Sequence, residues 1–154
     1  MNPLADLSKS PILYKIGETT YEVSPLTQND HGDFCRFVQY MGYYAMRDLP
    51  NMPPDAANQI LLSCARTSVA VGSKEYNAAN NNPDGQAELA FLSLRRKHPT
   101  ITREQVKQFP HEDLNNISGL LTILANPDAI QADQKKMEVV AQAIAILKSQ
   151  GKLM

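Results

Sequence analysis

Two residues in this chain have a type and a spacing that could do chemistry, His31 and Cys35. They lie four positions apart, so on a helix they would share one face, as a thiolate–histidine pair or two ligands of one metal ion require. A buried cysteine beside a surface histidine is the stronger interpretation, because free cysteine is among the most buried residue types. The other histidines, His98 and His111, form no pair with another histidine at this spacing.

Motifs that mark a catalytic or cofactor site do not occur in the sequence. It holds no GxGxxG, GxxxxGK(S/T) or GxSxG, so dinucleotide binding, P-loop chemistry and serine-hydrolase chemistry have no anchor. Its acidic residues are scattered along the chain and do not converge in sequence. The sequence therefore predicts no enzyme, no cofactor and no metal site.

The one basic cluster is Arg95-Arg96-Lys97, with Arg103 and Lys107 a few residues beyond it. Two short helices joined by a tight turn over residues 95–107 would have the outline of a helix-turn-helix, and these cations could contact phosphate. The alternative is a helix end whose cations complement the negative end of the helix dipole and are solvated. Fifteen basic against sixteen acidic residues give a net charge of -1, which favours the alternative and argues against nucleic acid as a partner.

Two predicted helices position this corner. A mostly apolar run predicts a helix over residues 86–97, which Pro99 ends. Thr102 has the type and position of an N-cap, and Gln105 can complete a capping box with it. A short helix over 103–109 follows.

A β-hairpin is predicted at residues 11–24. Ile12, Tyr14 and Ile16 alternate along one face, and Gly17 supplies the positive φ that the first position of a type II′ turn requires. Residues 1–10 show neither a long period nor a dense apolar face, and we expect a flexible arm there.

The rest of the chain is predicted to be helical, in two parts. The first part, 27–79, opens with a helix capped by Thr27 and Asp30, and a second helix runs from near Asp55 to Val71. An Asn-rich break over 77–85 is the predicted hinge. The second part, 86–154, adds a helix that begins at His111 and a last helix that starts near Asp128 or Asp133 and ends near Ser149.

These elements make a single mainly α domain over 1–154, with about five to six helices and a short N-terminal β-hairpin. The two cysteines, Cys35 and Cys64, lie inside apolar helical patterns and are expected to be reduced. No basic segment followed by an apolar core opens the chain, and no window approaches the ~20 apolar residues that span a bilayer. We expect a soluble, cytoplasmic protein without a membrane partner.

Two segments carry a resemblance to a known family. The hairpin ends in YEVSPLT at 21–27, and the second half of the chain contains LRRKHPTITREQV at 94–106, followed by a helix with an acidic start. This order of features resembles the tail assembly chaperones of long-tailed bacteriophages. The likeness spans residues 12–125, and its parts are a hairpin, a proline stop and a capping box.

The resemblance implies a non-enzymatic role in the host cytoplasm. The chain would coat the tape measure protein and keep it soluble until tail tube subunits polymerise around it. The tape measure protein is the implied partner, tail tube protein is a second one, and self-association is a further expectation.

The apolar pattern suggests where such a partner would bind. The first and last helices carry apolar stripes that could face a partner helix, although core packing is the stronger interpretation for the last one. The candidate partner-binding residues are Met41, Tyr44, Met137, Val140, Ile144 and Leu147. The alternative function is a small nucleic-acid-binding or DNA-packaging accessory protein that uses residues 95–107, with Arg95, Arg96, Lys97 and Arg103 on the phosphates.

Overall fold

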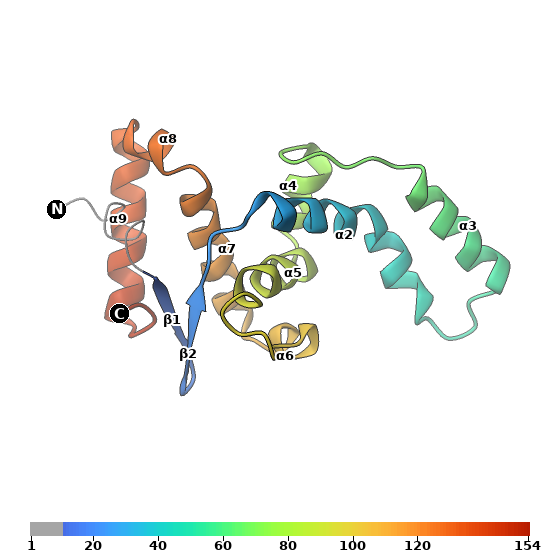
Figure 1. Cartoon of the computed structure of the whole chain (residues 1–154), viewed down its shortest axis with the longest axis horizontal. Coiled ribbons are helices and arrows are strands. Elements are labelled where there is room, and N and C mark those ends of the chain that lie inside the picture. Colours follow the sequence, from blue (N-terminus) through green and yellow to red (C-terminus); the bar gives the residue numbers. More distant parts are fainter. Residues whose placement is uncertain (1–10) are drawn as a thin grey trace.

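A computed structural model of the chain describes residues 11–154 and is mainly α, with an N-terminal β-hairpin, as predicted (Figure 1). The predicted flexible arm, 1–10, lies outside the described residues. The elements are β1 (Ile12–Ile16), β2 (Thr19–Val23), α2 (Gln28–Arg47), α3 (Pro54–Ala65), α4 (Lys74–Asn80), α5 (Pro83–Leu94), α6 (Arg103–Lys107), α7 (His111–Ala125), α8 (Pro127–Gln131) and α9 (Gln134–Ser149). None of these helices is long and apolar enough to cross a membrane.

The hairpin is antiparallel, with Ile12 opposite Val23 and Ile16 opposite Thr19. Gly17 has a φ of 60°, in the left-handed region that glycine enters at no steric cost. The free edge of β1 is covered by the C-terminal segment, because the Lys15 amide donates a 2.8 Å hydrogen bond to the carbonyl of Lys152. The hairpin therefore joins both ends of the described chain.

The central element is α5, which packs against α2, α4, α6, α7 and β2 (Figure 1). Nine of its twelve residues are buried, and its apolar residues do not keep to one side. A helix that is apolar all round belongs in a protein interior. Its position there places the basic corner, which directly follows α5, beside the start of α2.

The predicted hinge at 77–85 is mostly helical. Residues 77–80 end α4 and residues 83–85 begin α5, so only two residues connect the helices. The helices approach closely here, since a Cβ built on Gly85 would overlap the carbonyl oxygen of Ala79 and lie 2.6 Å from its carbonyl carbon. A hinge function at this point stays a prediction.

Between residues 11 and 154 the structure has eight helices, two more than the upper expectation: α4, which was not predicted, and α8, which is separate from α9. The helix expected from Asp55 to Val71 ends at Ala65, and α4 begins separately after Ser73, whose hydroxyl accepts from the amide of Tyr76. Both expected starts of the last helix occur, one at α8 and one at α9 with Asp133 as its N-cap. Side-chain caps thus start α4 and α9, whereas α8 begins at Pro127 without one.

A long protrusion leaves the body of the molecule. Helix α2 starts beside α5, but its second half extends away, and α3 folds back along it (Figure 1). We call residues 38–65 the arm; this segment is distinct from residues 1–10, for which the sequence predicts a flexible arm. No residue of α3 is buried, so α3 contributes nothing to the core of the body.

Candidate functional site

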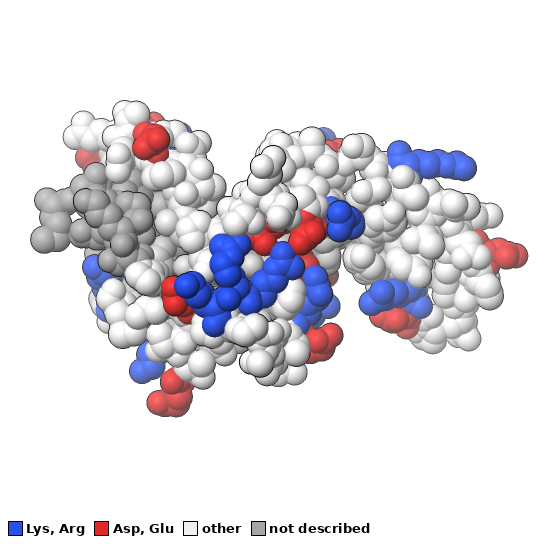
Figure 2. All heavy atoms as spheres, viewed as in Figure 1, with Lys and Arg blue, Asp and Glu red and all other residues white. Residues whose placement is uncertain are grey.

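The basic corner is held by acidic residues from α2. Arg95 donates to Asp30 and to Asp33, each at 2.8 Å, and Arg96 donates to Asp30 at 3.0 Å. Lys97 lies 3.9 Å from a carboxylate oxygen of Glu22. Figure 2 shows basic side chains gathered near the middle of one face, with acidic side chains among them. The cations predicted as phosphate contacts are therefore already paired within the protein.

Asp30 is the centre of this cluster and is buried. It forms the predicted capping box with Thr27, at 2.9 Å from its carboxylate to the Thr27 amide. Burial alone would raise the pKa of Asp30, but the hydrogen bonds from the Thr27 amide and from Arg95 outweigh it and lower the pKa. The carboxylate thus stays ionised and neutralises the corner, which counts against a nucleic-acid surface there.

Arg103 is held in a different way, by Glu88 of α5. Its Nε and one terminal nitrogen donate to the two carboxylate oxygens of Glu88 at 2.9–3.2 Å, and its guanidinium lies 4.3 Å from the centre of the Phe91 ring. The hydrogen bonds to Glu88 raise the pKa of Arg103. Glu88 is only 5% exposed, so this bidentate pair fixes α6 against the body.

The same arginine lines a groove of about 500 Å³ where the arm leaves the body. We call it the elbow groove. One side is α2, which contributes Asp33, Arg36, Phe37, Tyr44, Arg47 and Asp48. The opposite side is α5 and α6, which contribute Glu88, Arg103 and Lys107. The groove thus combines charged side chains with two aromatic rings.

Those rings form a continuous aromatic strip on α2. Phe37 stacks on Tyr44 at 6.0 Å between ring centres and on the buried Phe34 at 6.1 Å. Arg47 lies over the Tyr44 ring at 5.0 Å. The other side of α2 is occupied by α3, where Gln39 donates a 2.9 Å hydrogen bond to the carbonyl of Cys64. Of this strip, Tyr44 is exposed and Phe37 is half-buried against the core, and these two rings line the groove.

Large exposed apolar residues concentrate in the arm and the connection that follows it. Of the eight that the structure describes, five lie between residues 44 and 71: Tyr44, Met46, Leu49, Leu62 and Val71. Concentrated exposure of this kind marks protein-binding surfaces.

The structure places the predicted partner-binding residues in two different environments. Tyr44 lines the elbow groove, and Met41 is half-buried on the same helix. In contrast, the stripe on α9 packs into the core, because Val140, Ile144 and Leu147 are buried there and Met137 is partly buried. Ile144 and Leu147 also line a second groove, so a partner contact by these residues stays a prediction. The exposed apolar residues of α9 are Val139 and Ile146.

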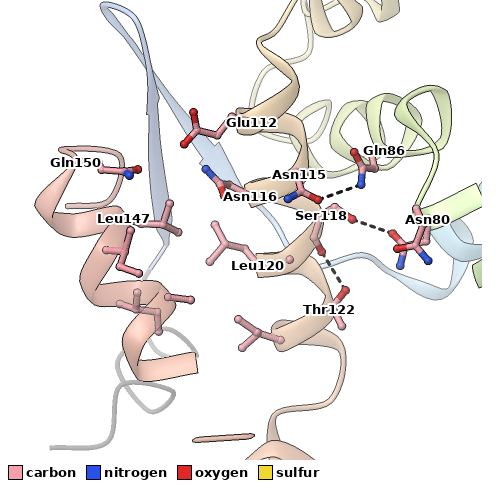
Figure 3. A pocket seen from close by; sticks show the side chains of 16 residues that line it. Asn80, Gln86, Glu112, Asn115, Asn116, Ser118, Leu120, Thr122, Leu147 and Gln150 are labelled. Carbon is pink, nitrogen blue, oxygen red and sulfur yellow. Dashed lines mark hydrogen bonds between the residues drawn. The ribbon is translucent and has the colours of Figure 1, made fainter. Parts of the chain in front are cut away.

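A second groove, of about 450 Å³, crosses α7 between α9 and the α4–α5 turn (Figure 3). Amides and hydroxyls line it, and they bond to one another: Gln86 donates to Asn115 at 3.2 Å, and Ser118 donates to Asn80 at 2.8 Å. Within the described chain, the Gln86 Oε1 is a buried side-chain acceptor without a donor. It has less than 1 Å² of accessible surface, so no ligand in this groove reaches it as it stands.

The His31–Cys35 pair shows no arrangement for catalysis. The His31 Nδ1 lies 2.7 Å from the Tyr76 hydroxyl rather than beside the thiol as its bonded partner. Burial raises the pKa of Cys35, which keeps the thiol protonated and unreactive. Between residues 11 and 154 we find no cluster of three or more His, Cys, Asp or Glu side chains that could hold a metal ion.

Three groove residues escaped the sequence prediction, namely Arg36, Phe37 and Arg47, whereas Lys107 was predicted only as a phosphate contact. A signal for these three was present, because both 36 and 37 lie three or four residues before 40, and 44 and 47 continue the same steps along one face of a helix. That face carries arginines together with aromatics. Lys107 lies on another helix, and no local pattern joins it to α2.

Comparisons with family models, with curated proteins and with solved structures find no match to this chain. The case for a function therefore rests on the resemblance of two segments and on the geometry of the arm and the elbow groove.

Proposed function

We propose that this protein is a non-enzymatic tail assembly chaperone of a long-tailed bacteriophage. It binds the tape measure protein in the host cytoplasm and keeps it soluble until the tail tube forms. The observation that carries the proposal is the arm: α3 packs along α2, buries none of its residues and leaves large apolar side chains exposed. A helix needs a partner for its apolar side, and a second protein can supply one.

The two segments that carry the family resemblance support the proposal by lying against each other. The Arg96 guanidinium donates to the Pro25 carbonyl at 3.3 Å. The Glu22 amide donates to His98 Nε2 at 2.9 Å. The likeness therefore concerns one structural unit, which connects the hairpin, the start of α2 and the end of α5.

Co-expression with the tape measure protein of the same phage tests the proposal. We expect the chain to keep that protein in the soluble fraction. Replacing Leu49 and Leu62 together by Asp should abolish this effect, because both side chains are exposed on the arm and its connection.

The matched control replaces Val139 and Ile146 by Asp, since they are similarly exposed on α9, far from the arm (Figure 1). We expect the control variant to protect the tape measure protein as well as the unaltered chain does. Loss of protection in the control but not in the arm variant would contradict the proposed binding surface. Failure of the unaltered chain to solubilise the tape measure protein would contradict the proposed function.

A further inference from the structure

We propose that the elbow groove selects a helix by charge: it binds one turn of an amphipathic helix whose apolar stripe is flanked by acidic residues. This inference rests on the proposed function, because it specifies the chemistry of the partner segment that the chaperone holds. The occupant is a helix of another protein, with its apolar side chains on the aromatic strip and its carboxylates on the rim of the groove.

The size of the groove fits such an occupant. One turn of an α-helix, as a cylinder about 10 Å wide and 5.4 Å long, fills roughly 420 Å³. The groove offers about 500 Å³. Its aromatic strip, Phe37 and Tyr44, supplies the apolar contact that anchors an amphipathic helix at positions three and four residues apart.

Four cations and three carboxylates line the groove, and they differ in how far they are exposed to a ligand. Of its carboxylates, Glu88 is buried and committed to Arg103. Asp33 lies between Arg95, at 2.8 Å, and Arg36, at 3.5 Å. These two carboxylates are therefore held by the protein itself, and Asp48 is the one that remains well exposed, at 83%.

The cations of the rim are available to a partner. The side chain of Arg36 is 72% exposed and that of Arg47 is 51% exposed. Lys107, also exposed, pairs with no carboxylate in residues 11–154. Arg36 also pairs with Asp33 at 3.5 Å and Arg47 with Asp48 at 3.6 Å, so the groove holds four cations against three carboxylates and Lys107 is the cation left over. Beside an aromatic floor, this excess of one cation complements an acidic helix and opposes a basic one.

The same arrangement disfavours nucleic acid as the occupant. Within the groove, Arg103 already binds Glu88, and Arg36 and Arg47 pair with Asp33 and Asp48. A phosphate backbone gains its affinity from cations that are free to pair with it. A carboxylate-bearing helix needs fewer of them, because the aromatic floor supplies apolar contact.

Three synthetic peptides test the inference on the full chain. They share one length and one leucine stripe at i, i+3, i+4 and i+7, and their flanking residues are all Glu, all Gln or all Lys. Binding is measured by fluorescence anisotropy at low salt and at 0.5 M salt. Exposed ion pairs are weak, so the one excess cation predicts roughly twofold to fivefold tighter binding of the Glu peptide than of the Gln peptide. The Lys peptide should bind weakest, and high salt should reduce the differences.

Variants assign the preference to the groove. Arg36→Gln with Lys107→Gln should bring the Glu and Gln peptides to nearly equal affinity. The control, Lys135→Gln with Lys148→Gln, removes two exposed cations of α9 and should keep the full preference.

The outcomes separate this inference from the proposed function. Equal affinity for the three peptides would overturn the charge selection while leaving helix binding intact. Absence of binding by all three would instead contradict helix binding itself. Tighter binding of a single-stranded oligonucleotide, with displacement of the Glu peptide, would overturn the inference in favour of a nucleic-acid surface.

Discussion

Replacing Gly85 with Ala tests how closely α4 and α5 are packed. A Cβ at this position would overlap the Ala79 carbonyl oxygen and lie 2.6 Å from the carbonyl carbon, whereas ordinary van der Waals contact begins at 3.4 Å. The obstacle is backbone rather than a flexible side chain, so α4 as a whole must move away. That movement also strains the 2.8 Å hydrogen bond from Ser118 to Asn80, at the end of α4.

The expected change in the free energy of unfolding for Gly85→Ala is the sum of opposing contributions. Ala is better than Gly inside a helix by about 0.5–1 kcal/mol. Forcing extra volume into a packed site costs about 1–3 kcal/mol or more, and the loosened hydrogen bond costs about 1 kcal/mol. We expect Gly85→Ala to lower the free energy of unfolding by about 2 kcal/mol. For a chain of this length that corresponds to a fall in Tm of roughly 4–8 °C.

Urea unfolding followed by circular dichroism measures this change, with Gly119→Ala as the matched control. Gly119 is an exposed residue inside α7, and a Cβ on it would meet nothing within 4 Å. Only the gain in helix propensity remains there, so we expect the control to be about 0.5–1 kcal/mol more stable than the unaltered protein. If Gly85→Ala proves as stable as Gly119→Ala, the close approach of α4 and α5 is refuted, and 77–85 would behave as the flexible connection that its composition predicts.

Further variants probe the ion-pair cluster, the arm and the hairpin. Asp30→Asn should cost about 2 kcal/mol at pH 7, since it leaves Arg95 with one carboxylate fewer and removes a charged cap. Because the folded pKa of Asp30 lies below its ordinary value of 3.8, this stability is present above that pH and is lost as the pH falls below it, so acid unfolding curves of the two proteins should converge. Leu62→Ser should change the unfolding free energy by less than about 0.5 kcal/mol, because Leu62 is exposed on the arm. Leu92→Ala should cost about 2–5 kcal/mol, because Leu92 is buried in α5. Equal losses would contradict the finding that α3 lies outside the core of the body. Tyr14→Phe should cost about 1–2 kcal/mol in chemical unfolding, because the buried hydroxyl donates to Asp113 at 2.7 Å.

The local features of the fold could be predicted from the sequence. Both capping boxes, Thr27 with Asp30 and Thr102 with Gln105, occur at the expected positions. Each depends on residues three apart, whose geometry is set once a helix begins. The turn at Gly17 is predictable for the same reason, because its φ is a property of one residue.

Contacts between distant residues could not be predicted in this way. The partner of Arg95 is Asp30, 65 positions earlier, and nothing near Arg95 in the sequence indicates it. Glu88 is buried although glutamate is ordinarily exposed, because α5 is enclosed on all sides and Arg103 pairs with it. The elbow groove depends on both of these pairings, and this explains why its residues were assigned to separate hypotheses or missed.

The apolar stripe on α9 shows a different limit of prediction from the sequence. Val140, Ile144 and Leu147 have a spacing that suits either a core or a partner helix, and the period of a stripe is the same in both cases. Only the positions of the neighbouring elements decide between them. Here the stripe belongs to the core, while the exposed apolar residues concentrate in the arm.

The contact between the two ends of the described chain has a consequence for the order of events during synthesis. Leu153 bridges to Tyr14, and Lys152 lies 2.9 Å from Asp113, which also accepts the hydrogen bond of the Tyr14 hydroxyl. On a ribosome the chain emerges from its N-terminus at about 5–20 residues per second, so β1 is exposed many seconds before these partners exist. Helix α3, in contrast, needs only α2, which directly precedes it. The arm can therefore form early on the nascent chain, whereas the edge of the hairpin stays open until Lys152 and Leu153 have been added.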